Sequence, residues 1–147
     1  MPRGRGRGRG QGRQCAAVPL AERGGEILVM LVTSRETRRW VLPKGWAEEG
    51  SAPHALAAKE AFEEAGIVGE AAAEPVGSYG YLKRLPGGRS MPCRVEVFPL
   101  RVERLLDDWP ERGQRERRWF TPARAAAAVQ EGELAALLLR MAAAPGV

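Results

Sequence analysis

The chain has 147 residues and a formal net charge of +5, from 23 lysines and arginines against 18 aspartates and glutamates. This length predicts one domain with a single hydrophobic core. No apolar run approaches the roughly 18 residues of a membrane-spanning helix, and the basic N-terminus lacks the apolar segment of a signal peptide. Cys15 and Cys93 form no CxxC pattern. We therefore expect reduced thiols in a cytoplasmic protein, without a disulfide or a zinc site.

The excess of positive charge lies in residues 1–14, MPRGRGRGRGQGRQ, which contain five arginines and no acidic residue. Removing these five from the 23 basic residues leaves 18, equal to the 18 acidic residues, so residues 15–147 are neutral overall. A Gly-Arg repeat cannot bury a core, so we expect a disordered tail over 1–14 and one domain over 15–147. The tail is either simply solvated or binds RNA weakly through its charge.

The domain begins with strand patterns. Runs of apolar residues predict strands over 16–22 and 26–34, joined by a hairpin at Gly24-Gly25, and a third short strand over 38–43. Proline and glycine then predict a loop from Pro43 to Gly45.

A central helix is expected next, from about Ser51 to Ala65. Pro53 suits its first turn, and Gly66 is typical of the residue that ends a helix. Ser51 is interpreted as the N-cap, because its hydroxyl can accept a hydrogen bond from a free backbone N–H.

More strands follow, and then helices. We expect, in order, a strand over 76–84, a turn at 86–88, a strand over 93–103, a short strand over 117–120, and helices over 122–130 and 133–144. Thr121 and Pro122 are typical of a helix N-cap and of the first helical position. This order of elements predicts a one-domain α/β or α+β sandwich.

An acidic cluster lies on the predicted central helix. Residues three and four apart are neighbours on a helix, so Glu60, Glu63 and Glu64 are expected on one face. Like charges at this spacing destabilise an isolated helix by roughly 0.2–0.5 kcal/mol per pair. Such a cluster is either a solvated face or a cation site, and carboxylates with room for water suit Mg²⁺ or Mn²⁺. The charge pattern alone leaves both interpretations open.

The residues around this cluster resemble the signature of the Nudix hydrolases. That signature is Gly, five residues, Glu, seven residues, Arg-Glu, an aliphatic residue, one residue, Glu-Glu, one residue, Gly and an aliphatic residue. The chain is in register with it at Gly45, Glu60, Ala61, Glu63, Glu64, Gly66 and Ile67. Two positions depart: Ser51 replaces the first glutamate, and Lys59 replaces the arginine, keeping its charge but not its planar fork.

The resemblance implies a fold, a reaction and residue roles. It implies an α/β/α sandwich with a mixed central sheet, and metal-dependent hydrolysis of a diphosphate linked to another group. Glu60 and Glu64 match the metal-ligand positions for Mg²⁺ or Mn²⁺, with a loop carbonyl near Lys44 or Gly45 as a further ligand. Glu63 matches the general-base position, and Glu60 is the alternative for that role.

A wider similarity, from about Ala16 to Ala128, resembles the diphosphoinositol polyphosphate and diadenosine polyphosphate phosphohydrolases of the same family. It rests on RRWVLPKG at 38–45 and on DDWPERGQRERRWF at 107–120. In that subgroup, basic residues before the signature hold a densely phosphorylated ligand. The resemblance therefore implies substrate binding by Arg35, Arg39 and Lys44, and a nucleoside- or inositol-polyphosphate substrate.

Two alternatives stay open for the function. One is an RNA-directed Nudix pyrophosphohydrolase in which the tail holds the RNA, and the other is a catalytically weakened Nudix-fold binding module. Trp40 and Trp119 are expected in the core rather than stacked on a base. His54 is expected in the first helical turn and is not assigned to catalysis. The expected partner is a small phosphorylated substrate, without a membrane.

Overall fold

The structure is a computed structural model that describes residues 11–143; residues 1–10 and 144–147, with most of the predicted tail, lie outside the described part. The described elements are β1 (Gly12–Arg23), β2 (Glu26–Thr33), β3 (Trp40–Val41), β4 (Lys44–Trp46), α1 (Pro53–Ala65), β5 (Ile67–Ala71), β6 (Gly77–Arg84), the 3-10 turn η2 (Pro86–Gly88), β7 (Ser90–Leu105), β8 (Arg117–Phe120), α2 (Pro122–Ala128) and α3 (Gly132–Ala143).

Two long strands, β1 and β7, form the centre of a mixed sheet and run parallel to each other. Each half of this central pair has its own antiparallel neighbours. β1 pairs with β4 near its start and with β2 near its end, whereas β7 pairs first with β6 and then with β5. β3 and β8 extend the sheet beyond β2.

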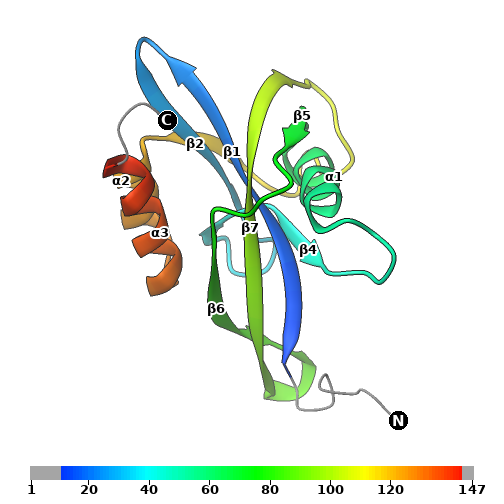
Figure 1. Ribbon diagram of the computed structural model, residues 1–147. Helices are drawn as coiled ribbons and strands as arrows, with labels where there is room; N and C mark the ends of the chain where they lie inside the picture. Colours follow the sequence, from blue (N-terminus) through cyan, green and yellow to red (C-terminus); the bar gives the residue numbers. More distant parts are fainter. Residues whose placement is uncertain (1–10, 144–147) are drawn as a thin grey trace.

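Helices cover both faces of this sheet, because β1 carries apolar side chains on both of its sides. Ala16 and Val18 point to one face and pack in the cluster that includes residues of α2 and α3. Cys15 and Ala17 point to the other face and pack in the cluster that includes α1. Figure 1 shows α1 on one side of the sheet and α2 and α3 on the other. The predicted α/β/α sandwich with a mixed central sheet is confirmed.

The start of the domain differs from the prediction. β1 begins at Gly12, so residues 12–14 are not part of a disordered tail. They lack an apolar run, but they pair in parallel with residues 93–95 of β7, and Gln14 is buried. Backbone pairing with a central strand outweighs their polar composition.

Two short strands were also not predicted. The expected loop at Pro43–Gly45 is wrong from Lys44 onward, because Lys44–Trp46 forms β4 and pairs with β1. β5 follows α1 after the single residue Gly66 and pairs with the end of β7. Both strands are too short for a periodic pattern, and the long central strands supply their partners.

The start of α1 corrects the interpretation of Ser51. The N-cap residue is Ala52, with an extended backbone and no side-chain hydrogen bond, and Pro53 is the first helical residue. A residue before proline is pushed away from helical geometry, which places the cap at Ala52. Ser51 instead lies in a turn, where its N–H donates to the carbonyl of Glu48 at 3.3 Å.

Other expectations about the helices are confirmed. Gly66 ends α1 with a left-handed φ of 66°, and Thr121 caps α2 by accepting from the N–H of Arg124 at 3.3 Å. Trp40 and Trp119 are partly buried and pack against the two core clusters. Between residues 11 and 143, no helix is both long enough and apolar enough to cross a membrane.

Candidate active site on the central helix

The close approach of α1 to β4 depends on a glycine. A Cβ atom built on Gly45 would lie 2.5 Å from the carboxylate of Glu60, closer than any side-chain carbon tolerates. Glycine at this strand position therefore lets the acidic face of the helix reach the sheet.

Glu60 and Glu64 form a carboxyl pair one helical turn apart, with a hydrogen bond between their side chains. Glu64 is only 6% exposed. Burial raises the pKa of Glu64 to about 8, and Glu60 adds to the rise while Arg115 opposes it. Burial also raises the pKa of Glu60. The pair therefore holds a proton near neutral pH, as two neighbouring buried carboxyl groups do when their charge is not fully compensated.

Glu63 lies at the exposed edge of the expected cluster of three glutamates, where its negative charge adds to the rise in the pKa of Glu60. Its side chain is one-third exposed and faces Lys59, with 3.9 Å between Nζ and Oε2. The i, i+4 spacing places Glu63 with Lys59 on one stripe of the helix and Glu64 with Glu60 on the next. Among residues 11–143, no three His, Cys, Asp or Glu side chains converge to hold a metal ion.

The loop between β7 and β8 holds the C-terminal end of α1, where carbonyl groups lack helical partners. The loop donates from Glu111 N to Glu63 O (3.0 Å), from Trp109 Nε1 to Glu64 O (3.2 Å) and from Leu106 N to Gly66 O (2.8 Å). Arg117, the first residue of β8, donates from Nη1 to Ala65 O (2.7 Å). The guanidinium of Arg117 also stacks on Trp109, 4.0 Å from the ring centre. This loop therefore fixes the backbone that carries Glu63 and Glu64.

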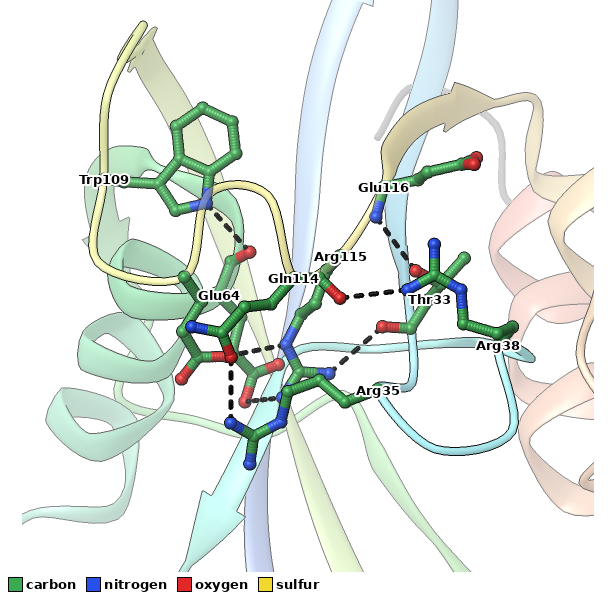
Figure 2. Close-up of polar contacts among 9 residues, drawn as sticks. Thr33, Arg35, Arg38, Glu64, Trp109, Gln114, Arg115 and Glu116 are labelled. Carbon is green, nitrogen blue, oxygen red and sulfur yellow. Dashed lines mark hydrogen bonds and ion pairs between the residues drawn. The ribbon is translucent and has the colours of Figure 1, made fainter.

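Arg115, also in this loop, is the cation that pairs with Glu64. Its Nη2 lies 3.8 Å from Oε2 of Glu64, its Nε bonds Glu111 at 2.7 Å, and its Nη1 donates to the carbonyl of Thr33 at 3.1 Å. Figure 2 shows Arg115 reaching from the loop toward Glu64. Arg115 and Glu111 were not predicted as site residues, because a pairing between distant segments leaves no local pattern.

The predicted substrate-binding arginines separate in space. Arg35, in the turn after β2, donates to Gln114 Oε1 at 3.1 Å and lies on the side of Glu64 and Arg115 (Figure 2). Arg39 instead donates to Oε1 of Gln130, between α2 and α3, at 2.6 Å. Arg38, which was not predicted as a site residue, donates from its side chain to the Gln114 carbonyl at 3.0 Å. Its backbone is left-handed, with φ of 60°. The structure thus brings Arg35, but not Arg39, toward the carboxyl pair.

Lys44 lies on the opposite face of β4 from the contact between Gly45 and Glu60, since neighbouring strand residues point to opposite faces. Its Nζ is 5.2 Å from the centre of the Tyr81 ring, and the Tyr81 hydroxyl donates to Gln14 at 2.7 Å. Burial lowers the pKa of Lys44, while the negative charge of Glu64 opposes that change. Lys44 is therefore a half-buried cation on the other face of β4, near enough to Glu64 for their charges to interact.

The carboxyl pair fits a divalent cation. Two adjacent carboxyl groups that hold a proton for lack of counter-charge offer hard oxygen ligands, and a metal ion can take the place of that proton.

The backbone of β4 offers a further oxygen ligand. Two hydrogen bonds fix the ladder between β1 and β4: Ala17 N donates to Pro43 O, and Ala47 N donates to Arg13 O. Because the hydrogen-bonded pairs alternate along an antiparallel ladder, the Gly45 carbonyl faces Cys15 of β1. The carbonyl of the neighbouring residue, Lys44, therefore points away from β1. Gly45 as a ligand remains a prediction.

Comparison with known proteins identifies the family. The NUDIX domain model matches residues 11–140. The chain belongs to the NUDIX family, whose hydrolases generally use divalent metal ions. It is 36% identical over 100 residues to Nudix hydrolase 12, mitochondrial, of Arabidopsis thaliana, covering 63% of this chain and 47% of that protein. It is 34% identical over 106 residues to mouse diphosphoinositol polyphosphate phosphohydrolase 3-alpha, covering 68% and 57%.

Both of these relatives are named as hydrolases. The chain spans about half the length of these relatives. Solved structures agree on the fold: a Caenorhabditis elegans Ap4A hydrolase in a binary complex superposes with a TM-score of 0.66 at 18% identity, covering 90% of this chain and 96% of that one. The NUDIX domain of Shewanella oneidensis NrtR gives 0.66 at 15% identity, covering 91% and 89%.

Proposed function

We propose that this chain hydrolyses a phosphoanhydride bond in a nucleoside- or inositol-polyphosphate substrate, with Mg²⁺ or Mn²⁺ as its cofactor. The buried pair of Glu60 and Glu64 in a NUDIX domain carries the proposal, because it lacks a full counter-charge. A phosphoanhydride repels an attacking hydroxide through its own negative charge. A bound divalent ion neutralises that charge and orients the water.

The roles of the glutamates follow from their environments. Glu60 and Glu64 hold the ion, together with the backbone carbonyl of Gly45 or its neighbour Lys44. Glu63 is the proposed general base: it is partly exposed on the last turns of the same helix, and its contact with Lys59 is long at 3.9 Å. Glu60 is the alternative base. Arg115 keeps Glu64 in place from the other side, through its own bond to Glu111.

The substrate class follows from the basic residues near the pair. Arg35 and Lys44 supply positive charge on two sides of it, and Arg39 lies farther along the same turn. Several cations suit a ligand with many phosphates. The names of two similar proteins, a diphosphoinositol polyphosphate phosphohydrolase and an Ap4A hydrolase, refer to ligands of this kind. A cytoplasmic location also stays a prediction, since several relatives are named as mitochondrial.

A catalytically weakened binding module is the second candidate, favoured by the two departures from the signature. Ser51 brings no carboxylate to the loop, and Lys59 lacks the planar fork of an arginine. Glu64→Gln separates the two candidates, because it removes a charged metal ligand and keeps its size. We expect turnover to fall by a factor on the order of 10² or more, with an unchanged fold by circular dichroism.

The substrate is identified by measuring phosphate release from dinucleoside polyphosphates, diphosphoinositol polyphosphates, sugar nucleotides and 5′-triphosphate RNA, each with Mg²⁺ and with Mn²⁺. Near-normal turnover of Glu64→Gln at saturating metal ion would exclude the proposed metal site. No release from any of these compounds by the unmodified protein would favour the binding module.

A further inference from the structure

A buried acceptor without a partner lies on the face of the sheet that α2 and α3 cover. Glu131 lies between α2 and α3, and its Oε1 atom is buried with no hydrogen-bond partner. No lysine or arginine between residues 11 and 143 forms an ion pair with this side chain. Buried polar atoms of folded proteins are normally paired, so an unpaired carboxylate oxygen points to a bound group that donates to it.

Three side chains of the sheet lie around Glu131: Lys44 of β4, and Tyr79 and Tyr81 of β6. Lys44 pairs with Ala16, and Ala16 and Tyr79 both belong to the core cluster under α2 and α3. Side chains two apart along a strand point to the same face, so Tyr81 lies on this face as well. Burial raises the pKa of both tyrosines, and the negative charge of Glu131 adds to each rise. Glu131 therefore lies close to both phenol groups.

Lys44 connects this region with the carboxyl pair. Its Nζ lies 5.2 Å from the centre of the Tyr81 ring. Burial lowers the pKa of Lys44, and the charges of Glu64 and Glu131 both oppose that change. In the described sheet β4 pairs with β1 alone, so no strand covers its outer edge. An extended ligand can therefore reach from Glu64 past Lys44 to Glu131.

The group that binds beside Glu131 must donate hydrogen bonds, because a carboxylate only accepts them. A phosphate has the same sign of charge, so the phosphates of a ligand belong on the side of Glu64. A flat ring suits the aromatic neighbours, since Trp46 lies two residues beyond Lys44 on the same face, about 7 Å along the strand. Its indole is 44% exposed and offers a surface on which a base can stack.

Among the common bases, guanine matches a carboxylate best. Its Watson–Crick edge presents two adjacent donors, N1–H and N2–H₂, which can both donate to one carboxylate. Adenine places its N6–H₂ donor beside the N1 acceptor, and the lone pair of N1 would face a carboxylate oxygen. A buried acceptor that the correct base satisfies and the wrong base leaves unpaired discriminates strongly between them.

We propose that Glu131 binds the guanine base of a nucleotide substrate. The base lies between Glu131 and Trp46, and the phosphates continue past Lys44 to the carboxyl pair. This inference rests on the proposed function for the position of the phosphates. It deepens that function by selecting a guanine nucleotide over an inositol polyphosphate, which has no base to donate to Glu131.

The test is calorimetric binding of GMP, IMP and AMP to the full chain in Mg²⁺. None of the three contains a phosphoanhydride bond, so the proposed hydrolysis cannot occur. We expect GMP to bind about 10-fold or more tightly than AMP. IMP, which lacks only the N2 amine of GMP, should fall between them. This comparison uses the unmodified protein and needs no variant to fold.

Glu131→Gln should bind GMP and AMP alike, because an amide places a donor where guanine needs an acceptor. Glu133→Gln is the matched control and should keep the preference for GMP. It makes the same chemical change two residues later, but Glu133 accepts instead from Gly80 N and from Arg94, at the start of α3 beside β6 (Figure 1). Circular dichroism checks that both variants fold.

Four outcomes would overturn the proposal. They are equal binding of the three monophosphates, no binding of any of them, an unchanged preference in Glu131→Gln, and an equal loss of GMP and AMP binding in that variant. The last outcome would place the ribose hydroxyls, and not the base, beside Glu131. Phosphate release gives a separate readout: diguanosine tetraphosphate should be preferred over diadenosine tetraphosphate. If neither releases phosphate while GMP is still preferred, the proposed hydrolysis fails and the guanine site stands.

Discussion

The unusual protonation of Glu64 predicts how the stability of the metal-free protein changes with pH. Burial raises the pKa of Glu64 from an ordinary value of 4.5 to about 8. Between these two values the folded state keeps a proton at Glu64 that the unfolded state releases, so the contribution of Glu64 to stability is greatest below pH 4.5 and falls as the pH rises through that window. At about 1.4 kcal/mol per pKa unit, the total loss reaches at most roughly 4–5 kcal/mol.

Glu64→Gln isolates this effect, because a glutamine amide resembles the protonated acid and can donate to Glu60. In EDTA, we expect the variant to match the unmodified protein at the acidic end and to exceed its unfolding free energy by roughly 1–4 kcal/mol near pH 8. Urea unfolding at several pH values across the window measures this difference. Adding Mg²⁺ near pH 8 should stabilise the unmodified protein and not the variant.

Glu63→Gln is the matched control, since its side chain is one-third exposed and paired with Lys59. It should keep the pH slope of the unmodified protein. The reasoning fails if the unmodified protein becomes more stable as the pH rises through this window in EDTA, or if Glu64→Gln keeps the same slope.

Three further predictions follow from the site and the sheet. Glu63→Gln should slow turnover while keeping Mn²⁺ affinity in calorimetry; loss of Mn²⁺ binding would show that base and ligand have been exchanged. Deleting residues 2–10 should leave the free energy of unfolding unchanged. Deleting residues 2–14 should lower it by roughly 2–4 kcal/mol, because this deletion also removes the first pairs between β1 and β7 and the Gln14 acceptor of the Tyr81 hydroxyl. Arg35→Ala should reduce kcat/KM for a substrate with many phosphates about 10-fold or more beyond its effect on a nucleoside diphosphate derivative. Arg39→Ala should produce a smaller difference between the two substrates. Equal losses of kcat/KM on both substrates would show that Arg35 has a structural role.

The sequence alone determined the main elements and predicted the central helix as the place of the proposed chemistry. The apolar runs of β1, β2 and β7, the glycine after α1 and the Thr-Pro start of α2 are local signals, because each depends on residues that are close along the chain. The spacing from Gly45 to Ile67 was sufficient to suggest the family, since it combines a strand glycine with glutamates on one helix. Arg35 was predicted as a site residue, and the structure places it on the side of the carboxyl pair.

Only the tertiary structure decided which charges meet. Helical spacing groups three glutamates, but the folded chain buries Glu64 and leaves Glu63 partly exposed beside Lys59. Arg115 approaches Glu64 from a loop 51 positions later (115 − 64), and Arg39 turns to Gln130 instead of the carboxyl pair. Likewise, residues 12–14 are ordered by their partners in β7 and not by their own composition. Pairings between distant segments depend on where the folded backbone brings them, so the local sequence carries no signal for them.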